Sequence, residues 1–538
     1  MAATQPPVSK PVPFPTPRSL WENLNRDWLT GHGNFDDRVN QQWFANVETR
    51  YCQLQQHERL ISQSATDDEK GSKAETHPLL LIAEPEPHDF LASFWAALLS
   101  GWNVALANPH WGDRERNMAL EILQPSLIWP ASNNLSSLTF PHGHADMRPC
   151  SLEARHSLSC PSAILIPTGG TGGKLKFARH TWTTILTAAN GFCQTFPTPI
   201  HTYCVLPVHH VSGLMQLLRA WISQAQVVIT AFKTLETQPP LISNPTSWYI
   251  SLVPTQLTRL LTAGKGPWLS KFHAVLLGGA PTWPDLLAQA TEQKIPICLS
   301  YGMTETAAMV AAQTPREARH NPQATGSGSR LPHAQITIEA AGKTQPSNTV
   351  GQIVIHSQAI AHGYYSPGNP TKNPDFSSQT FRTDDLGYLT SQGQLHITGR
   401  ASSKIISGGE NIFPAEVEAA LHSTGQVKDV CVFSQPDPHW GEVVVAAFVP
   451  AHPDVSETTL RTALSNGKAG SILSRYKHPK KWISIKAVPR NAQGKILKSV
   501  LASQIELSQV SPPQIEQDQL SNASNTWAKD SDGGYLPR

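Results

Sequence analysis

Cysteine is scarce in this chain of 538 residues, and no Cys-x-x-Cys pair occurs. The seven cysteines are scattered along the sequence: Cys52, Cys150, Cys160, Cys193, Cys204, Cys298 and Cys431. Disulfide frameworks and cysteine-ligated zinc sites need closely spaced pairs, so the sequence disfavours both and favours a reducing compartment. We therefore expect a cytoplasmic protein, with an organelle left open.

An excess of charge of one sign is also missing. The chain has 42 basic and 40 acidic residues, which leaves a net charge of +2, and it contains no long run of like charge. Nucleic acids and anionic membrane surfaces are bound by concentrated positive charge. Neither is expected as a partner.

No apolar run is both long and uninterrupted. The longest, Phe90 to Ala107, carries no charge and approaches the roughly 18 residues that can span a bilayer. However, Ser100 to Asn103 interrupts it, so we expect a buried helix followed by a strand at Val104 to Ala107. The N-terminal stretch, Met1 to Arg18, is rich in proline without an apolar core, unlike a signal peptide or an anchor. We expect no membrane insertion.

Alternating short apolar runs and longer mixed segments predict an α/β fold. The expected strands are 79–83, 127–129, 163–166, 227–230, 248–252 and 274–277, with helices at 183–192 and 214–222 between them. Such alternation is typical of parallel sheets covered by helices. After about Thr325 the pattern becomes β-rich, with strands expected at 335–338, 352–356, 387–389 and 395–398. Pro414 is expected to open a helix of another α+β unit, because proline is favoured in a first helical turn.

These patterns divide the chain into four parts. We expect a proline-rich segment at 1–18 and a large domain at 19–400, with two helix-covered sheet subdomains and a β-rich part at about 325–398. A small α+β domain follows at 401–507. The polar tail at 508–538 has too few apolar residues to form a core and is expected to be disordered.

A cluster of glycines, threonines and lysines between Pro167 and Phe177 is the most distinctive local feature. Glycine clusters are usually surface turns. Here backbone N–H groups, threonine hydroxyls and a lysine could also surround a phosphate. The spacing matches neither a Walker A loop nor the dinucleotide-binding fingerprint. Alone, the cluster indicates only an anion site.

Six further motifs follow this cluster in a characteristic order. They are 207–213, 278–281, 301–306, 382–387 with Gly399 and Arg400, 408–412, and 489–495. Each is weak by itself. Together, over about residues 20–505, they resemble the adenylate-forming superfamily of acyl- and aryl-CoA ligases, luciferases and peptide-synthetase adenylation domains.

The resemblance implies an ATP and Mg²⁺ site within a large domain that carries a small, mobile C-terminal domain. It assigns the β- and γ-phosphates, the metal ion, the adenine and the ribose to residues of these motifs. In that order they are Thr168, Thr171, Gly172 and Lys176; Glu305; Tyr301 with Gly279 and Ala280; and Asp385 with Arg400. Gly170, Gly302 and Thr304 are assigned to ATP binding as a whole. Outside these motifs, Glu305 would be an ordinary solvated carboxylate and Asp385 a turn cap.

The same resemblance makes Lys495 the main catalytic residue, with Thr168 and Glu305 in support. Lys495 would bridge the attacking carboxylate and the α-phosphate, where charge develops in the transition state. The C-terminal domain would then rotate about a hinge at Ser402 and bring Gly408 and Gly409 to the coenzyme A channel. Without the other motifs, Lys495 would be a lysine in a glycine-containing turn.

Within the superfamily, the segments 167–178, 210–219 and 251–256 look like those of the o-succinylbenzoate–CoA ligases of menaquinone and phylloquinone synthesis. That aromatic dicarboxylate needs a cation for the carboxylate that is not activated. Arg219 is the candidate, because guanidinium can bind a carboxylate by a forked pair of hydrogen bonds. Ser212 and Thr255 would add hydrogen bonds, and His210 would line the acyl site without acting as a base.

Alternatives remain at this point. Arg219 could lie on a helix surface, the acid could be another acyl or aryl acid, and the fold could serve a non-catalytic nucleotide-binding protein. A carrier-loading adenylation domain is disfavoured because no serine-bearing carrier module follows Lys495. The chain also departs from the usual pattern at Gly169, Leu175, Phe177, Asp384 and Ser402.

Overall fold

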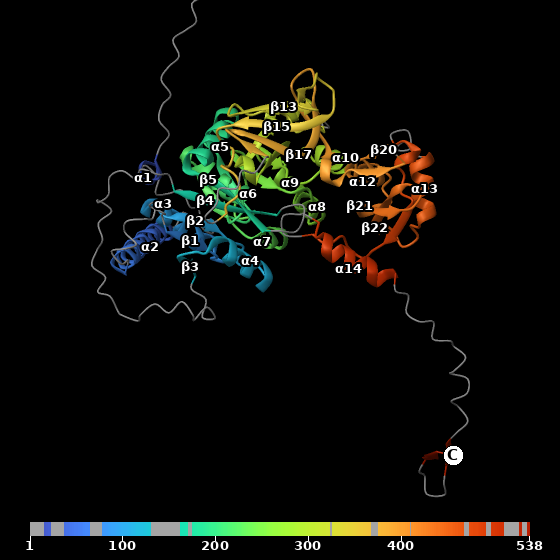
Figure 1. Cartoon of the computed structure of the whole chain (residues 1–538), viewed down its shortest axis with the longest axis horizontal. Coiled ribbons are helices and arrows are strands. Elements are labelled where there is room, and N and C mark those ends of the chain that lie inside the picture. The colour runs from blue at the N-terminus through green and yellow to red at the C-terminus, as the bar shows by residue number, and fades with distance from the viewer. Residues whose placement is uncertain are drawn as a thin grey trace, which may run out of the picture.

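The computed structural model describes residues 16–22, 37–64, 78–130, 162–169, 175–322, 325–366, 375–408, 410–466, 473–490, 496–509, 527–529 and 535–537. These parts contain five sheets, of which four are large (Figure 1). The four lie along the chain in sequence order, from the blue N-terminal sheet to the orange C-terminal one. This mixed α/β architecture confirms the predicted fold class.

The first sheet has the strand order β3-β1-β2-β4-β5. Its strands are β1 (Leu79–Ile82), β2 (Asn103–Leu106), β3 (Leu127–Trp129), β4 (Ala163–Gly169) and β5 (Leu175–Thr181). Strands β1 to β4 are parallel, and β5 returns antiparallel to β4. The helices of this part are α1 (Pro17–Glu22), α2 (Asp37–Ser64), α3 (Pro87–Ser100), α4 (Asp113–Leu123) and α5 (Trp182–Thr195). The apolar run from Phe90 is thus a buried helix followed by a strand, as predicted.

The second sheet has the order β12-β11-β10-β9-β8-β6-β7. Its strands are β6 (His201–Cys204), β7 (Val227–Ile229), β8 (Trp248–Leu252), β9 (Ala274–Leu277), β10 (Ile297–Met303), β11 (Ala308–Ala312) and β12 (Ser329–Arg330). Strands β6 to β10 are parallel. The intervening helices are α6 (Val211–Ile222), α7 (Phe232–Thr237), α8 (Pro254–Thr262), α9 (Gly266–Leu269) and α10 (Pro284–Glu292), and α11 (Pro315–His320) follows β11.

The third sheet is the predicted β-rich part and is antiparallel. It consists of β13 (Ala334–Ala340), β14 (Lys343–Thr344), β15 (Gly351–Ser357), β16 (Phe376–Ser377), β17 (Thr380–Leu389) and β18 (Leu395–Arg400). The pairing of β17 with β18 places Asp385 directly opposite Arg400. The sheet register thus brings together the two residues that the resemblance assigns to the ribose.

The fourth sheet belongs to the C-terminal part. Its strands are β19 (Ile405–Ser407), β20 (Glu410–Ile412), β21 (Val427–Asp437), β22 (Gly441–Pro450) and β23 (Lys481–Ser484), with helices α12 (Pro414–His422), α13 (Glu457–Asn466) and α14 (Lys498–Gln509). Helix α12 begins at Pro414, as predicted. In the tail, β24 (Trp527–Lys529) and β25 (Tyr535–Pro537) pair with each other.

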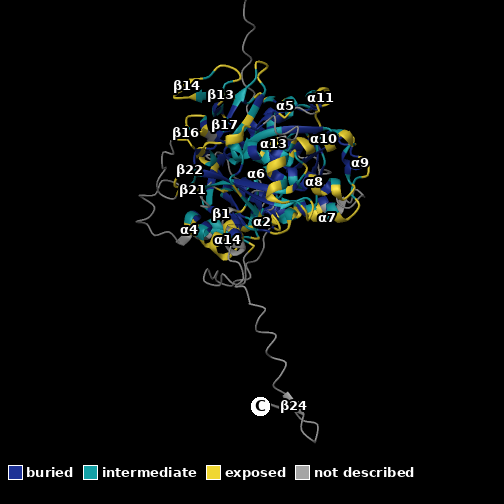
Figure 2. Ribbon diagram, turned by 90° about the vertical axis from the view of Figure 1, so that its right-hand side faces the viewer, coloured by how far each residue is buried: buried dark blue, intermediate teal, exposed yellow. Residues whose placement is uncertain are grey.

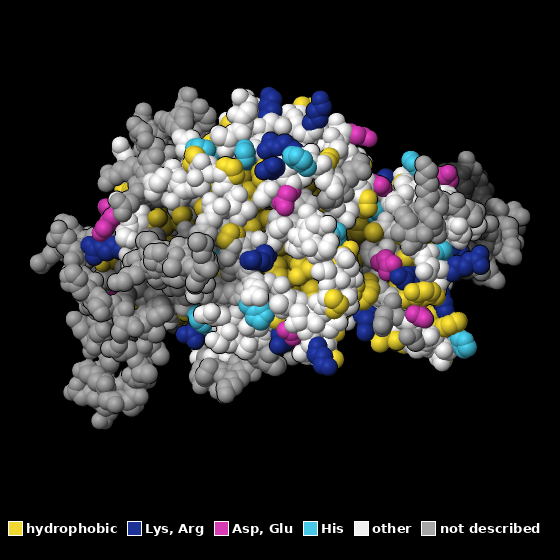
Figure 3. All heavy atoms as spheres, turned by 90° about the horizontal axis from the view of Figure 1, so that it is seen from above, with side chains coloured by type: hydrophobic (Ala, Val, Ile, Leu, Met, Phe, Trp, Pro, Cys, Tyr) yellow, Lys and Arg dark blue, Asp and Glu magenta, His cyan; other side chains and the backbone are white. Residues whose placement is uncertain are grey.

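Burial follows this layering. Figure 2 shows buried strands inside and exposed residues on the outer faces of the helices. On the face seen in Figure 3, Lys and Arg side chains are interspersed with Asp and Glu. Among the described residues, no helix combines the length and the apolar character needed to cross a membrane.

Candidate active site

The carboxyl ends of the parallel strands in the second sheet lead to several of the predicted site residues. Strand β8 leads to Thr255, β9 leads to Gly279 and Ala280, and β10 contains Tyr301 and Gly302. Because β8, β9 and β10 are adjacent and parallel, these residues lie at one edge of the sheet, where ligands bind in open α/β folds.

Two glycines are required by the backbone at this edge. Gly279 has a φ of +81°, in the left-handed region that glycine tolerates, as the chain turns away from β9. At Gly302 an added Cβ would lie 1.9 Å from the carbonyl oxygen of Ala308. Any side chain there would push β10 away from β11, and the turn η1 (Thr304–Thr306) that joins these strands would shift.

Strand β4 brings the start of the glycine cluster to that turn. Thr168 pairs in register with Lys176 on β5, and its hydroxyl lies 3.4 Å from Oε1 of Glu305. The Tyr364 hydroxyl donates a 2.8 Å hydrogen bond to the same oxygen. The Lys176 ammonium lies 4.4 Å from the centre of the Tyr364 ring. Thr168 and Lys176 from the glycine cluster and Glu305 from the motif 301–306 thus lie together around Tyr364.

A buried histidine fixes the position of this turn against β5. Nε2 of His180 lies 2.8 Å from the carbonyl oxygen of Thr304, and Nδ1 lies 3.0 Å from the Thr184 hydroxyl. Burial lowers the pKa of His180 to about 4, so the ring is neutral at pH 7. A neutral ring must donate from Nε2, because a carbonyl oxygen only accepts. Thr304, the residue before Glu305, is therefore bound by a side chain of β5, the strand that also carries Lys176.

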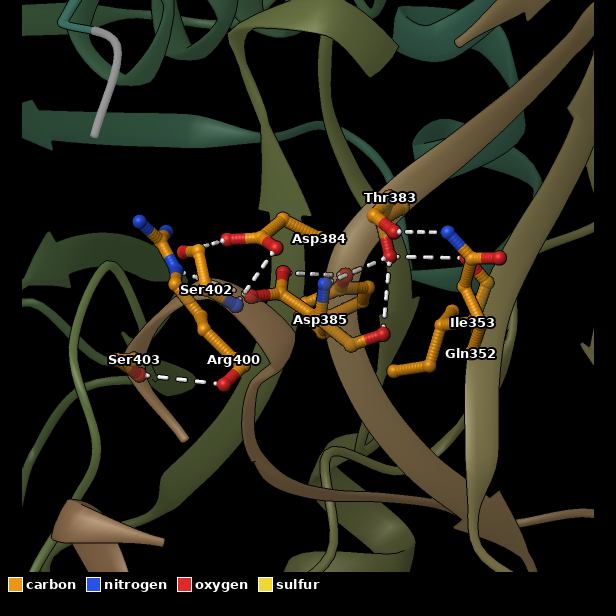
Figure 4. A network of polar contacts seen from close by, with 9 residues as sticks. Gln352, Ile353, Thr383, Asp384, Asp385, Arg400, Ser402 and Ser403 are labelled. Atoms are coloured by element: carbon orange, nitrogen blue, oxygen red, sulfur yellow. Dashed lines mark hydrogen bonds and ion pairs between the residues drawn. The ribbon is translucent and has the colours of Figure 1, made fainter. Parts of the chain in front are cut away.

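Asp385 is the centre of a second polar cluster (Figure 4). The Tyr301 hydroxyl donates to its Oδ2 at 2.7 Å, and Nε of Arg400 donates to its Oδ1 at 3.1 Å. Thr383 fixes the backbone, since its hydroxyl accepts from the Asp385 N–H at 3.1 Å and lies 2.9 Å from the carbonyl oxygen of Ile353. Burial and the Asp385 carboxylate raise the pKa of Tyr301 well above its ordinary value, which keeps the phenol protonated.

Ser402, the predicted hinge, lies in the turn η2 (Ala401–Ser403) directly after β18. Its backbone N–H donates to Oδ1 of Asp384 at 3.0 Å, and its hydroxyl donates to Oδ2 (Figure 4). Asp384 and Ser402 are both departures from the superfamily pattern, and they bind each other. Gly408 follows β19 with its N–H donating to the carbonyl oxygen of Trp440 at 2.9 Å.

Arg219 lies in the last turn of α6 and is only 3% exposed. Its guanidinium stacks over the Phe192 ring at 4.0 Å, and its Nε has no hydrogen-bond partner. No carboxylate of the described residues forms an ion pair with it. Burial lowers its pKa to about 10, which still leaves it charged at pH 7. The alternative of a helix-surface arginine is wrong.

Other buried polar atoms without partners lie at the start of α6, on α6 itself and on β8, the strand that leads to Thr255. They are Nε2 of His210 at the start of α6, Oε1 of Gln216 on α6 and Oγ of Ser251 on β8. Burial lowers the pKa of His210 to about 4, so this ring is neutral. Ser212 and Thr255 occupy the first turns of α6 and α8 and are partly exposed. Buried polar groups in folded proteins are normally satisfied, so these atoms indicate a place for water or ligand.

Several predicted residues lie outside the described parts of the chain. They are Gly170, Thr171, Gly172, Gly409 and Lys495. Conversely, the sequence analysis missed Tyr364, His180 and Phe192. Tyr364 is 59 positions from Glu305, and no local pattern connects them. His180 and Phe192 look like ordinary strand and helix residues in sequence.

The phosphate-side cluster has the donors that a magnesium ion needs. Mg²⁺ prefers oxygen ligands and keeps several waters or phosphate oxygens, so one or two protein oxygens suffice. Glu305 and Thr168 offer a carboxylate and a hydroxyl side by side. No group of three or more His, Cys, Asp or Glu side chains within the described ranges could hold a metal ion by itself. The residues present therefore fit Mg²⁺ shared with phosphates.

Comparisons with known proteins agree with this geometry. The AMP-binding enzyme family matches residues 69–365, and the AMP-binding enzyme C-terminal domain matches residues 416–495. The 2-succinylbenzoate–CoA ligase of Enterococcus faecalis is 32% identical over 340 residues, covering 62% of this chain and 68% of that protein.

Solved structures with this fold include o-succinylbenzoate CoA synthetase of Bacillus subtilis. Its complex with the acyl-adenylate intermediate OSB-AMP has a TM-score of 0.72 at 25% identity, covering 86% of this chain and 92% of that one. Its complex with ATP and magnesium ion has a TM-score of 0.70 at 25% identity, covering 86% and 94%. The chain therefore belongs to the AMP-binding, adenylate-forming enzymes, the family of AMP-forming acid–CoA ligases.

Proposed function

We propose that this ligase converts o-succinylbenzoate into its coenzyme A thioester, a step of menaquinone or phylloquinone synthesis. The observation that carries the proposal is Arg219, a buried guanidinium without a carboxylate partner among the described residues. The named function of the Enterococcus faecalis relative supports the same acid.

The cost of burying a cation favours an anionic ligand at Arg219. A buried charge destabilises a protein unless it is paired and hydrogen-bonded. Stacking on Phe192 offsets part of this cost, but it leaves the guanidinium N–H groups without an anion. A carboxylate of the substrate would complete the pairing.

The position of Arg219 along α6 fits an acid that carries a carboxylate at each of its two ends. Arg219 is nine positions beyond His210, so their backbones lie roughly 13 Å apart along the helix axis. Ser212 is seven positions before Arg219, so these two side chains lie on the same face of α6, whereas His210 is the N-cap residue before its first turn. The aromatic carboxylate would bind Arg219 in the interior. The aliphatic carboxylate would then lie toward Ser212 and Thr255, nearer the ATP site, with His210 lining the path.

The phosphate side would be formed by Thr168, Gly170, Thr171, Gly172 and Lys176. Lys176 would place positive charge on the β- and γ-phosphates, where negative charge grows as pyrophosphate leaves. Glu305, with Thr168 beside it, would hold Mg²⁺, which when bound neutralises phosphate charge. The contacts of Glu305 with Thr168 and Tyr364 support this assignment.

The nucleoside side would be formed by the Asp385 cluster. Asp385, oriented by Arg400 and Tyr301, would accept hydrogen bonds from the ribose hydroxyls. The Tyr301 ring, with Gly302 and Thr304 in the same segment, would stack on adenine against the backbone of Gly279 and Ala280. Strand β10 and its turn would thus connect the two ends of ATP.

The reaction would have two steps. The aliphatic carboxylate attacks the α-phosphate, a P–O bond to pyrophosphate breaks, and an acyl-adenylate forms. The coenzyme A thiol then loses its proton and attacks the acyl carbon, and AMP leaves. Lys495 would stabilise the first transition state, and Gly408 and Gly409 would line the thiol's path in the second.

Two domains would carry these steps. We infer a large domain at 19–400 and a mobile one at 401–507, with the hinge at Ser402. The Asp384–Ser402 contact would hold the hinge in the conformation seen here.

A substrate panel tests the proposal. The purified protein with ATP, Mg²⁺ and coenzyme A should release pyrophosphate and form a thioester with o-succinylbenzoate, and should do so less efficiently with benzoates or fatty acids. A better rate with another acid would replace the proposed substrate and leave the reaction class intact.

A further inference from the structure

Tyr364 touches two oppositely charged groups of the phosphate side at once. Its hydroxyl donates to Oε1 of Glu305 at 2.8 Å, and the Lys176 ammonium lies 4.4 Å from the centre of its ring. An ammonium over an aromatic face is held by the negative charge of that face. One side chain thus orients both a cation and an anion.

The backbone around Tyr364 is fixed to both elements that bear these charges. Tyr364 pairs with Ala178 on β5, two residues beyond Lys176. The N–H of Ala361 donates to the carbonyl oxygen of Glu305 at 2.9 Å. The Tyr364 ring is also packed edge-on against Phe376, with ring centres 5.3 Å apart. The segment 361–365 therefore ties β5 to the turn η1, and Tyr364 has little freedom to move.

The hydroxyl of Tyr364 is a permanent donor. A tyrosine hydroxyl ordinarily ionises only at about pH 10, so it carries its proton at neutral pH and can donate. Without it, the 3.4 Å contact with Thr168 would be the one hydrogen bond that the described residues give to Oε1 of Glu305. A carboxylate with so weak a partner is free to rotate, so Glu305 would no longer be held in one orientation toward the metal ion.

We propose that Tyr364 is a positioning residue that keeps Lys176 and Glu305 separately oriented toward the polyphosphate of ATP and its metal ion. This inference rests on the phosphate and metal roles proposed above for Lys176 and Glu305. Tyr364 itself touches neither the acid nor its proposed pocket residues. It sets the affinity for ATP with Mg²⁺ and leaves the affinity for the acid unchanged.

Two substitutions separate the two contacts of Tyr364. Tyr364→Phe keeps the ring under Lys176 and removes the hydrogen bond to Glu305, whereas Tyr364→Leu removes both. Tyr365→Phe is the matched control, because it deletes a neighbouring hydroxyl from a side chain that packs against the core of the first sheet. Thermal unfolding of each variant reports whether it folds.

Calorimetric titration with ATP, in excess Mg²⁺ and in EDTA, is the direct readout. In Mg²⁺, Tyr364→Phe should bind ATP about tenfold more weakly than the wild type, which is the expected effect of losing a hydrogen bond to a charged group. In EDTA, its affinity for ATP should equal that of the wild type. Tyr364→Leu should bind ATP about threefold more weakly than Tyr364→Phe in both buffers, because the ring that holds the Lys176 ammonium is also gone. Tyr365→Phe should match the wild type. The KM for the acid should not change in any variant.

Equal weakening by Tyr364→Phe in both buffers, or a parallel rise in the KM for the acid, would overturn the inference in favour of a general structural role. Wild-type affinity in both buffers would also overturn it. If the binding pattern is as expected but no acid supports pyrophosphate release, the positioning role stands and the proposed function fails.

Discussion

Replacing Arg219 by leucine should damage recognition of the dicarboxylate far more than binding of ATP. The guanidinium is 3% exposed and stacked on Phe192, so a carboxylate bound to it would be shielded from water. Removing one partner of a buried, hydrogen-bonded charge pair costs roughly 2–5 kcal/mol. The lower limit corresponds to about a 30-fold loss in kcat/KM.

The assay compares o-succinylbenzoate with 4-oxo-4-phenylbutanoate, which has the same reacting end and lacks the aromatic carboxylate. The wild type should prefer the dicarboxylate strongly. In Arg219→Leu this preference should fall by about 30-fold or more, because only the dicarboxylate loses a contact. Arg259→Leu is the matched control: Arg259 also stacks on a ring, that of Phe232, but is exposed and pairs with Glu236.

Three results would refute this reasoning. The preference could stay the same in Arg219→Leu, the KM for ATP could rise as much as that for the acid, or Arg259→Leu could have the same effect. A loss of folding would be a different matter, and urea unfolding checks it. Because an unpaired buried charge is costly, Arg219→Leu should be no less stable than the wild type without substrate.

Three further predictions follow from the site and the hinge. Lys495→Ala should slow pyrophosphate release by about 100-fold or more while ATP binding persists, and unchanged release would show that Lys495 does not act in the adenylation step. Asp384→Ala removes the acceptor of both Ser402 hydrogen bonds, so trypsin should cut at Lys404 faster than in the wild type; equal rates would show that this contact does not hold the hinge. The pKa values of His180 and His210 are about 4 in the folded chain, because both rings are buried, and near 6.5 when unfolded. The unfolded chain then binds more protons between these values, so the urea midpoint should be lower at about pH 5 than at about pH 7.5, and equal midpoints would contradict it.

Local pattern predicts the elements of this fold well. Proline at the start of α12 and glycine after α3 mark helix ends, and the alternation of strands and helices predicts the parallel sheets. Strand ends are less predictable, because β17 continues through the motif around Asp385 to pair with both β15 and β18. Pairing with neighbours, which lie far away in sequence, decides how long a strand continues.

The candidate site was predictable where one motif carries the chemistry. Glu305, Asp385 and Lys176 could be named from their motifs, but Tyr364 could not. Its role depends on a contact across 59 positions, formed when the segment 361–365 lies against both β5 and the turn η1. The mutual contact of Asp384 and Ser402 was equally hidden, since each looks like an isolated departure in sequence.

The central claim is the identity of the acid, and one competition experiment tests it most directly. The enzyme, ATP, Mg²⁺ and coenzyme A are mixed with equal amounts of o-succinylbenzoate, 4-oxo-4-phenylbutanoate, benzoate and a fatty acid, with pyrophosphate and each thioester measured separately. We expect the o-succinylbenzoate thioester to dominate and to match pyrophosphate in amount. A dominant thioester of any other acid would contradict it.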